Sequence, residues 1–222
     1  MGFRYVLGVD LDGVCADYNS GFRDVVAADR GIDPVELLPN RSWGFKEWGL
    51  DEAEFDRLHQ KAVTEDRMLA TLPVIDGCSD VLWRLSDAGV WIRIITHRLY
   101  KNWGHAAAAT DTVTWLDNAK IPYRDICFLG AKPEVEADLY IDDAPHNIVG
   151  LRDAGNDVIV FDQSYNAGLR GPRAKNWAEV EEIAMSYVAS ASAVQPQLPG
   201  IDAGADRIDT NRPTVQDNTR SR

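Results

Sequence analysis

Five short runs of β-branched or other apolar residues constrain the fold of this chain more than any other feature of its sequence. They span residues 5–10, 91–96, 126–129, 138–142 and 157–161. Most of them are nearly continuous in apolar residues rather than alternating, which is the pattern of strands buried on both faces of a parallel sheet. Helical segments, among them 76–88 and 106–119, lie between them. Strands that alternate with helices predict an α/β fold with a doubly wound parallel sheet.

Residues 17–73 interrupt this alternation. The interval contains helical stretches, including 20–30 and 51–62, and no convincing strand. It is too long for a crossover loop in a compact domain, so we expect a small helical unit of its own. Residues 190–222 are polar, contain Pro and Gly and lack aromatic side chains, which predicts a disordered tail. The expected division is a core of residues 1–16 and 74–189, a helical insertion of 17–73 and a tail of 190–222.

The composition argues against several classes of function. Lys and Arg number 23 and Asp and Glu 35, so the formal charge is −12, whereas a protein that binds duplex nucleic acid normally presents a basic face. A small anionic substrate stays compatible, because a local cluster of cations can outweigh a distant net charge. The sequence has no run of about 18 apolar residues and no secretory signal, which predicts a cytoplasmic protein without a membrane span. The oligomeric state stays open, a homodimer included.

The sequence Asp10-Leu11-Asp12-Gly13-Val14 closes the first predicted strand. The strand delivers Asp10 to the carboxyl edge of the sheet, where open parallel sheets hold their ligands. Two close carboxylates attract a hard cation such as Mg²⁺ and can divide the roles of nucleophile and acid/base. A solvated Asp-rich turn is the structural alternative. A calcium loop is excluded, because its twelfth position, counted from Asp10, would be Glu and is Gly21.

Polar residues follow the other predicted strands as well. Thr96 and His97 end the second strand, Lys132 follows the third, and Asp142 and Asp143 end the fourth. A Thr hydroxyl with the backbone N–H groups after it can bind phosphate oxygens, whereas adjacent buried acids need a cation or a donor. Each signal alone is weak, since such residues are usually structural. Their common position at one edge of the sheet favours a site that handles phosphate.

Four segments, taken in this order, resemble the motifs of the haloacid dehalogenase superfamily of phosphohydrolases. They are DLDGV at 10–14, ITHR at 95–98, Lys132 and IDD at 141–143. Within the superfamily, the chain is similar to the 5′(3′)-deoxyribonucleotidases, the cytosolic type C 5′-nucleotidase family. The opening DLDGVCADYNSGF, the spacing from Lys132 to the paired acids and the late FDQSYN and WAEV segments carry this resemblance, which covers residues 5–187. It implies a Mg²⁺-dependent phosphomonoesterase for nucleoside monophosphates, with deoxyribonucleotides favoured.

The resemblance also implies a role for each acidic residue. Asp10 would be the nucleophile that forms an aspartyl-phosphate, and Asp12 would protonate the leaving oxygen and then activate water. Mg²⁺ would be held by the Asp10 carboxylate, the main-chain carbonyl of Asp12, and Asp143, with Asp142 orienting a metal-bound water.

The phosphoryl oxygens would be bound by Thr96 and Lys132. His97 stands where relatives often have a small Ser or Asn, so it could contact phosphate or pack beside the site. The other histidines are expected to be structural or exposed; they are His59, His105 and His146. The tryptophans outside the insertion are expected to be core or packing residues; they are Trp83, Trp91, Trp103, Trp115 and Trp177.

The resemblance further implies that the helical insertion covers the active site, because insertions between the first and the second motif do so in this superfamily. It is rich in aromatic residues, whose flat faces can stack on a nucleobase. The candidates for substrate contact are Tyr18, Trp43, Phe45 and Trp48. Tyr18 follows the catalytic loop closely and is the strongest of them. Most aromatic residues in a helical bundle belong to the core, so we expect about one or two of the four to face the substrate.

Other functions remain as alternatives. A phosphatase of the same superfamily could act on a sugar phosphate or another small metabolite, and the aromatic positions that face the site would separate the two. A non-catalytic phosphate-binding protein is disfavoured, because both Asp10 and Asp12 are present. A dehalogenase is disfavoured by Asp12, since dehalogenases of this superfamily usually lack the second acid.

Overall fold

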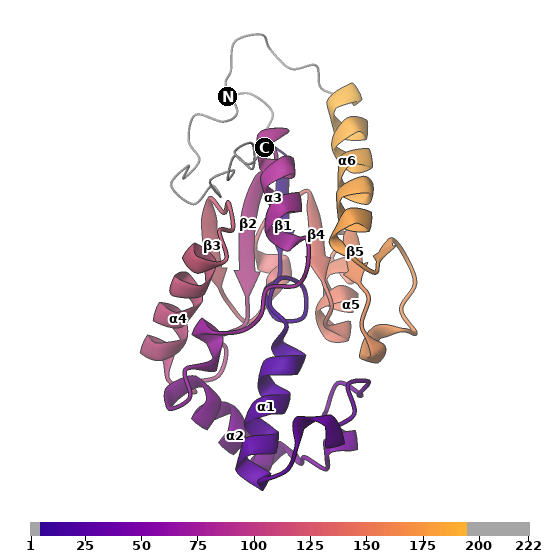
Figure 1. Ribbon diagram of the computed structural model, residues 1–222. Coiled ribbons are helices and arrows are strands. Elements are labelled where there is room, and N and C mark those ends of the chain that lie inside the picture. Colours follow the sequence, from indigo (N-terminus) through magenta and orange to yellow (C-terminus); the bar gives the residue numbers. More distant parts are fainter. Residues whose placement is uncertain (1–4, 195–222) are drawn as a thin grey trace, which may run out of the picture.

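The computed structural model describes residues 5–194, and these form a parallel sheet with helices on both faces (Figure 1). The strands are β1 (Val6–Val9), β2 (Trp91–Thr96), β3 (Asp125–Phe128), β4 (Leu139–Asp142), β5 (Val158–Phe161) and β6 (Arg173–Ala174). They lie in the order β3-β2-β1-β4-β5-β6, and every neighbouring pair is parallel. The predicted α/β fold with a doubly wound parallel sheet is confirmed.

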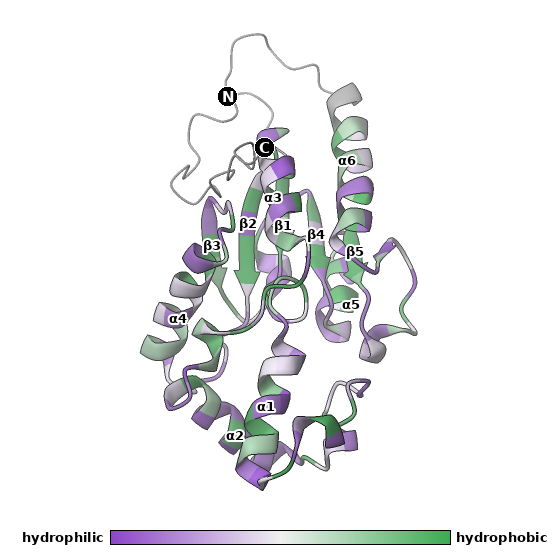
Figure 2. Cartoon of the chain, viewed as in Figure 1, coloured by the Kyte–Doolittle hydropathy of each residue, from purple (hydrophilic) through white to green (hydrophobic). Residues whose placement is uncertain are grey.

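Alternating residues of the strands pack into two separate hydrophobic clusters, one on each face of the sheet. Leu139 and Ile141 pack in the larger cluster, whereas Tyr140 between them packs in the smaller one, because successive side chains of a strand point to opposite faces. The larger cluster includes residues of α3 (Cys78–Asp87), α4 (His105–Asn118) and α6 (Trp177–Val194), and the smaller includes residues of α5 (Pro145–Asp153). Figure 2 shows hydrophobic green over much of β1, β2, β4 and β5.

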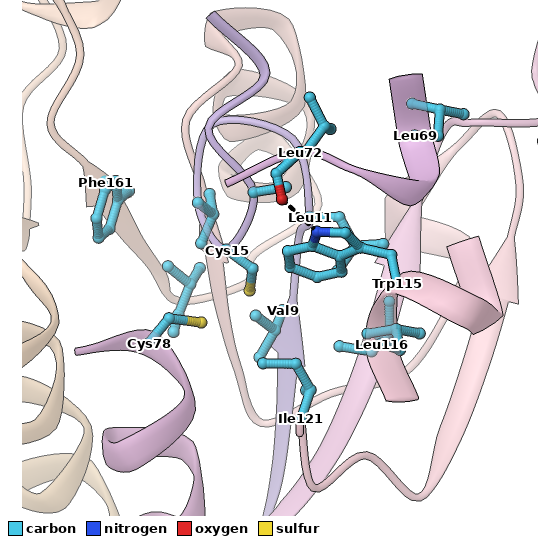
Figure 3. Close-up of a cluster of buried hydrophobic side chains, with 14 of the residues drawn as sticks. Val9, Leu11, Cys15, Leu69, Leu72, Cys78, Trp115, Leu116, Ile121 and Phe161 are labelled. Carbon is cyan, nitrogen blue, oxygen red and sulfur yellow. Dashed lines mark hydrogen bonds between the residues drawn. The ribbon is translucent and has the colours of Figure 1, made fainter. Parts of the chain in front are cut away.

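The larger cluster reaches from the sheet into the insertion (Figure 3). Val9 of β1 and Leu11 of the first motif pack there with Leu72 and Trp115. The indole Nε1 of Trp115 donates a hydrogen bond to the main-chain carbonyl of Leu72 at 2.7 Å. The end of the insertion is thus fastened to α4 by a buried polar contact as well as by apolar packing.

The insertion is helical throughout its regular structure, as the sequence predicts. It contains α1 (Tyr18–Arg30) and α2 (Glu52–Thr64), which lie beyond the carboxyl ends of the strands in Figure 1, and short 3₁₀ turns at Pro34–Glu36, Lys46–Trp48 and Met68–Ala70. Its two ends meet at a bridge between Ala16 and Val74. Asp17 caps the N-terminus of α1 (Tyr18–Arg30) by accepting a hydrogen bond from the main-chain N of Ser20 at 3.0 Å.

Two details of the chain differ from expectation. β6 was not predicted, because a two-residue strand shows no periodicity. Helix α6 continues to Val194, so residues 190–194 are helical rather than part of a disordered tail. The remainder of the predicted tail, 195–222, lies outside the described residues. Among those described, no helix has both the length and the apolar character that crossing a membrane requires.

Candidate active site

The candidate site lies at the carboxyl ends of the neighbouring strands β1 and β4. The chain continues from β1 toward β2 and from β4 toward β5, so neighbouring connections diverge here and leave a crevice at the edge. Asp10 follows β1 directly, and its main-chain N donates to the carbonyl of Ile141 in β4 at 3.1 Å. Asp142 ends β4. The sheet therefore brings the first and the fourth motif together.

Three buried carboxylates meet at this point. Asp10, Asp142 and Asp143 each offer a carboxylate oxygen, and these oxygens all lie within 4.8 Å of one another. Lys132 is 2% exposed, and its Nζ donates to Oδ1 of Asp10 and to Oδ2 of Asp142, both at 2.6 Å. The structure thus unites four of the residues that the sequence selected, from three separate segments.

The positive charge of Lys132 does not balance this cluster. Burial, together with Asp142 and Asp12, raises the pKa of Asp10 to about 7 despite the nearby Lys132. Burial, Asp10 and Asp142 likewise raise the pKa of Asp143 well above its ordinary value. Although burial alone would lower the pKa of Lys132, Asp10 and Asp142 raise it, so its ammonium stays charged. A set of hard oxygen donors short of positive charge fits a divalent cation such as Mg²⁺.

Neighbouring groups hold the paired acids in place. Oδ1 of Asp142 accepts from the main-chain N of Ala144 at 2.9 Å. The Tyr165 hydroxyl donates to Oδ2 of Asp143. Gly13 has a φ of +86°, and a Cβ built there would lie 2.0 Å from that same Oδ2. Glycine is required at position 13 because a side chain would displace Asp143.

Asp12 lies apart from the three acids, and its carboxylate does not belong to the cluster. It is held instead by Arg98, whose Nε and Nη2 donate to its two oxygens at 3.0 and 2.6 Å. Asp12 still lines the cavity above the cluster. The Asp12 carboxylate thus lies at the cavity while both of its oxygens are held by Arg98.

Thr96 and His97 both line the cavity at the end of β2. The Thr96 side chain is buried, and its Oγ1 accepts from the main-chain N of Arg98 at 3.4 Å. Burial and the nearby Lys132 lower the pKa of His97 to about 4, so its ring is neutral at physiological pH. Its Nε2 is buried and has no hydrogen-bond partner within residues 5–194. His97 therefore packs over the site as a neutral ring, stacked on His146 with centroids 6.1 Å apart.

A cavity of about 650 Å³ opens above these residues, between the core and the insertion. The predicted aromatic residues differ in their access to it. Tyr18, Trp43 and Phe45 line the cavity, and Trp48 does not. Trp48 is 2% exposed, and its Nε1 donates to the carbonyl of Leu38 at 2.7 Å. The predicted substrate contact therefore does not hold for Trp48, whose ring belongs to the core of the insertion.

The three lining aromatics are themselves engaged by neighbours. The Tyr18 hydroxyl is hydrogen-bonded to Nδ1 of His59 at 2.7 Å. Phe45 is 6% exposed, and the Arg41 guanidinium lies 3.7 Å above its ring. Trp43 is 46% exposed and packs edge-on against Tyr165. Tyr18 and Trp43 therefore have more surface to offer a ligand than Phe45.

Several cavity residues escaped the sequence analysis. His59 and His146 were expected to be structural or exposed, and Trp103 to be a packing residue. All three line the cavity, as do Arg41 and Tyr165. Burial lowers the pKa of His59 to about 4, so it is a neutral partner for Tyr18. No local motif marks these residues, because the fold brings them together from separate segments; the FDQSYN segment that contains Tyr165 was the one available signal.

Arg41 is buried without a carboxylate partner. It is 6% exposed, its Nε donates to Oδ1 of Asn19 at 2.6 Å, and its Nη1 donates to the carbonyl of Ser42 at 3.1 Å. Its Cζ lies over the rings of Phe45 and Tyr165, at 3.7 and 4.7 Å from their centroids. No ion pair of Arg41 occurs among the described part of the chain. The guanidinium thus supplies a positive charge at the cavity that is not engaged in a direct ion pair with any described carboxylate.

Comparisons with known proteins agree with this geometry. The model of the family described as 5′ nucleotidase, deoxy (pyrimidine), cytosolic type C protein matches residues 4–191. A protein of Chlorobaculum tepidum, whose provisional name is 5′(3′)-deoxyribonucleotidase, is 42% identical over 185 residues, which cover 82% of this chain and 91% of the relative.

Solved structures share the fold at low identity. A haloacid dehalogenase superfamily hydrolase of subfamily IA from Geobacter sulfurreducens has a TM-score of 0.52 at 12% identity, over 82% of this chain and 100% of that one. A haloacid dehalogenase-like hydrolase from Streptococcus pneumoniae has a TM-score of 0.54 at 13% identity, over 82% and 98%. The family model and the 42% identical relative show that the chain belongs to the cytosolic type C family of 5′ (deoxy)nucleotidases, phosphoric monoester hydrolases of the haloacid dehalogenase type.

Proposed function

We propose that this protein is a Mg²⁺-dependent phosphomonoesterase that hydrolyses nucleoside monophosphates, with deoxyribonucleotides preferred, through an aspartyl-phosphate on Asp10. The observation that carries the proposal is the buried cluster of Asp10, Asp142 and Asp143, with Lys132 bonded to two of them. A nucleophilic carboxylate and a phosphate are both anions, so they can approach each other only where cations offset their repulsion.

The metal would be held by the Asp10 carboxylate, the main-chain carbonyl of Asp12, and Asp143, with Asp142 orienting a bound water. The fit rests on the donor set, which consists of hard oxygens, and on the raised pKa values of Asp10 and Asp143, which indicate missing positive charge. When bound, Mg²⁺ would offset the negative charge of the phosphoryl group.

The reaction would take two steps, formation of the aspartyl-phosphate and its hydrolysis. Lys132 binds Oδ1 of Asp10, so Oδ2 is left to attack phosphorus, and the ester bond breaks as Asp12 passes a proton to the leaving oxygen. Water then attacks the aspartyl-phosphate, its proton passes to Asp12, and the bond between Asp10 and phosphorus breaks. Thr96 and Lys132 would bind the phosphoryl oxygens, and the neutral His97 would cover them.

The substrate would extend from the phosphoryl group into the cavity. We propose that residues 17–73 act as a cap on a core of residues 1–16 and 74–189; the bridge between Ala16 and Val74 supports this division. Within the cap, Tyr18 and Trp43 offer aromatic surface on which a base could stack. The Phe45 ring is covered by the Arg41 guanidinium, so Phe45 would contribute by supporting Arg41. Arg41 would donate to an acceptor of the substrate, since its charge has no carboxylate partner.

A phosphate-release screen tests this function. Purified protein with Mg²⁺ is offered deoxyribonucleoside and ribonucleoside monophosphates, with phosphate at the 5′ or the 3′ position, and sugar phosphates as the comparison set. The expected result is a higher kcat/KM for deoxyribonucleoside monophosphates than for sugar phosphates. Equal or better hydrolysis of sugar phosphates would replace the nucleotide assignment by a general metabolite phosphatase.

A further inference from the structure

Arg98 and Asp12 form a two-point ion pair at the edge of the cavity. Nε of Arg98 donates to Oδ2 of Asp12 at 3.0 Å, and Nη2 donates to Oδ1 at 2.6 Å. Two parallel hydrogen bonds fix the plane of a carboxylate as well as its position. The Arg98 side chain is 2% exposed and the Asp12 side chain 28% exposed. A buried cation thus holds a carboxylate that still reaches the cavity.

Helix α4 holds the Arg98 guanidinium through the nitrogen that does not contact Asp12. Nη1 of Arg98 donates to Oγ1 of Thr112 at 3.1 Å, and that hydroxyl donates to the carbonyl of Ala108 at 2.7 Å. The ring of Trp115 lies 5.9 Å from Cζ of Arg98. Thr112 and Trp115 are both buried, so the place of Arg98 is set by a packed helix rather than by a mobile surface contact.

We propose that Arg98 is a positioning residue for the acid/base carboxylate: its two-point contact holds Asp12 where it can reach the leaving oxygen and then the attacking water. This rests on the function proposed above, in which Asp12 transfers both protons. A general acid or base acts only within hydrogen-bond reach of its proton. The three acids and Lys132 do not restrain the Asp12 carboxylate, which lies outside their cluster, so this restraint falls to Arg98.

The test compares two leaving groups. A nucleoside leaves phosphorus as an alkoxide and needs a proton from Asp12, whereas para-nitrophenolate is stable enough to leave without one. In Arg98→Met, kcat/KM for a deoxyribonucleoside monophosphate should fall about a hundredfold, the size expected when a catalytic group is misplaced by about 1 Å. For para-nitrophenyl phosphate, kcat/KM should stay within about threefold of native, because this constant reports formation of the aspartyl-phosphate.

Two further variants refine the test. Arg98→Lys keeps the charge but loses the two-point geometry, so it should recover only part of the nucleotide activity. Thr112→Val keeps Arg98 and removes its anchor, so it should show the same selective loss at a smaller size, about tenfold, and serves if Arg98→Met fails to fold. Arg84→Met is the matched control, because Arg84 makes an equivalent two-point contact to Glu181 at 2.7 and 2.6 Å, away from the cavity. This variant should leave kcat/KM unchanged for both substrates.

The outcomes separate the inference from the function on which it rests. In the Asp12→Asn background, adding Arg98→Met should lower kcat/KM for the nucleotide no further. The effects of two substitutions are not additive when the two residues act as a unit. An additive loss, or equal losses on both substrates, would show that Arg98 is merely structural. Native-like nucleotide activity in Asp12→Asn would instead overturn the proposed function, and the inference with it.

Discussion

At the scale of single residues, the site depends on charges that are buried and then held by specific donors. Lys132 shows this most clearly, because its ammonium is 2% exposed and bonded to both Asp10 and Asp142 at 2.6 Å. Removing one member of such a group leaves its partners buried without compensation, which is costly. The side chains of this cluster are therefore tied to one another in stability as well as in chemistry.

Asp10→Asn is the most direct test of the nucleophile. The amide keeps the size of the side chain but cannot form an acyl-phosphate by the same route and is a poorer metal ligand, so kcat should fall by at least about a thousandfold. The measurement is phosphate release from a deoxyribonucleoside monophosphate, with circular dichroism to verify that the variant is folded. Activity close to native in a folded variant would exclude Asp10 as the nucleophile.

Tyr18→Ala tests the proposed contact between residues 17–73 and the base of the substrate. Tyr18 lines the cavity with its hydroxyl bonded to His59, and loss of a base–aromatic stack costs about 1–3 kcal/mol. We expect kcat/KM for the nucleotide to fall by about tenfold to a hundredfold, while para-nitrophenyl phosphate is spared. Proportional losses on both substrates would mean that Tyr18 supports the catalytic loop rather than the base. Tyr18→Phe, which keeps the ring, should retain most of the preference.

At the scale of elements, the sequence predicts the strands well and the cavity poorly. The apolar run at 91–96 coincides with β2, and the other four predicted strands match β1, β3, β4 and β5 to within one residue at each end. They could be predicted because continuous apolar runs flanked by polar residues mark buried strands. The motif acids and Lys132 could be found because each lies at the end of a strand or within four residues after it. Arg41, His59 and Tyr165 come from a loop, a helix and a short 3₁₀ turn, and only the tertiary fold reveals that they share a cavity.

Two tryptophans of the insertion separate packing from recognition. Trp48 is 2% exposed with its indole bonded to Leu38, whereas Trp43 is 46% exposed and lines the cavity. Trp48→Ala should lower the free energy of unfolding by about 3–5 kcal/mol, the usual cost of removing a buried Trp. Trp43→Ala should cost about 1 kcal/mol or less and act mainly on KM for the nucleotide. Urea unfolding and steady-state kinetics on both variants give the comparison, and equal losses of stability would contradict it.

At the scale of the whole molecule, stability depends on buried groups that must change charge when the chain unfolds. His59 has a pKa of about 4 in the folded protein against an ordinary value of 6.5. Below pH 6.5 the unfolded chain binds a proton that the folded one does not, so this residue's contribution to stability is lost as the pH falls from about 6.5 toward 4. At pH 5 the loss from His59 amounts to about 2 kcal/mol.

His59→Gln isolates this contribution, because Gln can still hydrogen-bond to Tyr18 but does not titrate. The free energy of unfolding, measured by urea at pH 7.5 and at pH 5, should fall by about 2 kcal/mol less in the variant than in the native protein. An equal fall in both proteins would show that His59 is not held neutral. His105 lies on the exposed side of α4, so His105→Gln is the control and should behave like the native protein.

The whole molecule should also respond to Mg²⁺ apart from any turnover. Three buried carboxylates with one ammonium are short of positive charge, so an ion that binds the folded state stabilises it by RT ln(1 + [Mg²⁺]/Kd), about 2.7 kcal/mol at a hundredfold excess over Kd. For a chain of this size that corresponds to a rise in Tm of roughly 5–10 °C, measured by differential scanning calorimetry with and without a chelator.

Two variants locate the ion. Asp143→Asn should abolish the rise in Tm, and Asp12→Asn should keep it, since the carboxylate of Asp12 lies outside the cluster. Chelation should remove phosphatase activity and added Mg²⁺ restore it, whereas an equal rise in Tm in native protein and Asp143→Asn would place the ion elsewhere.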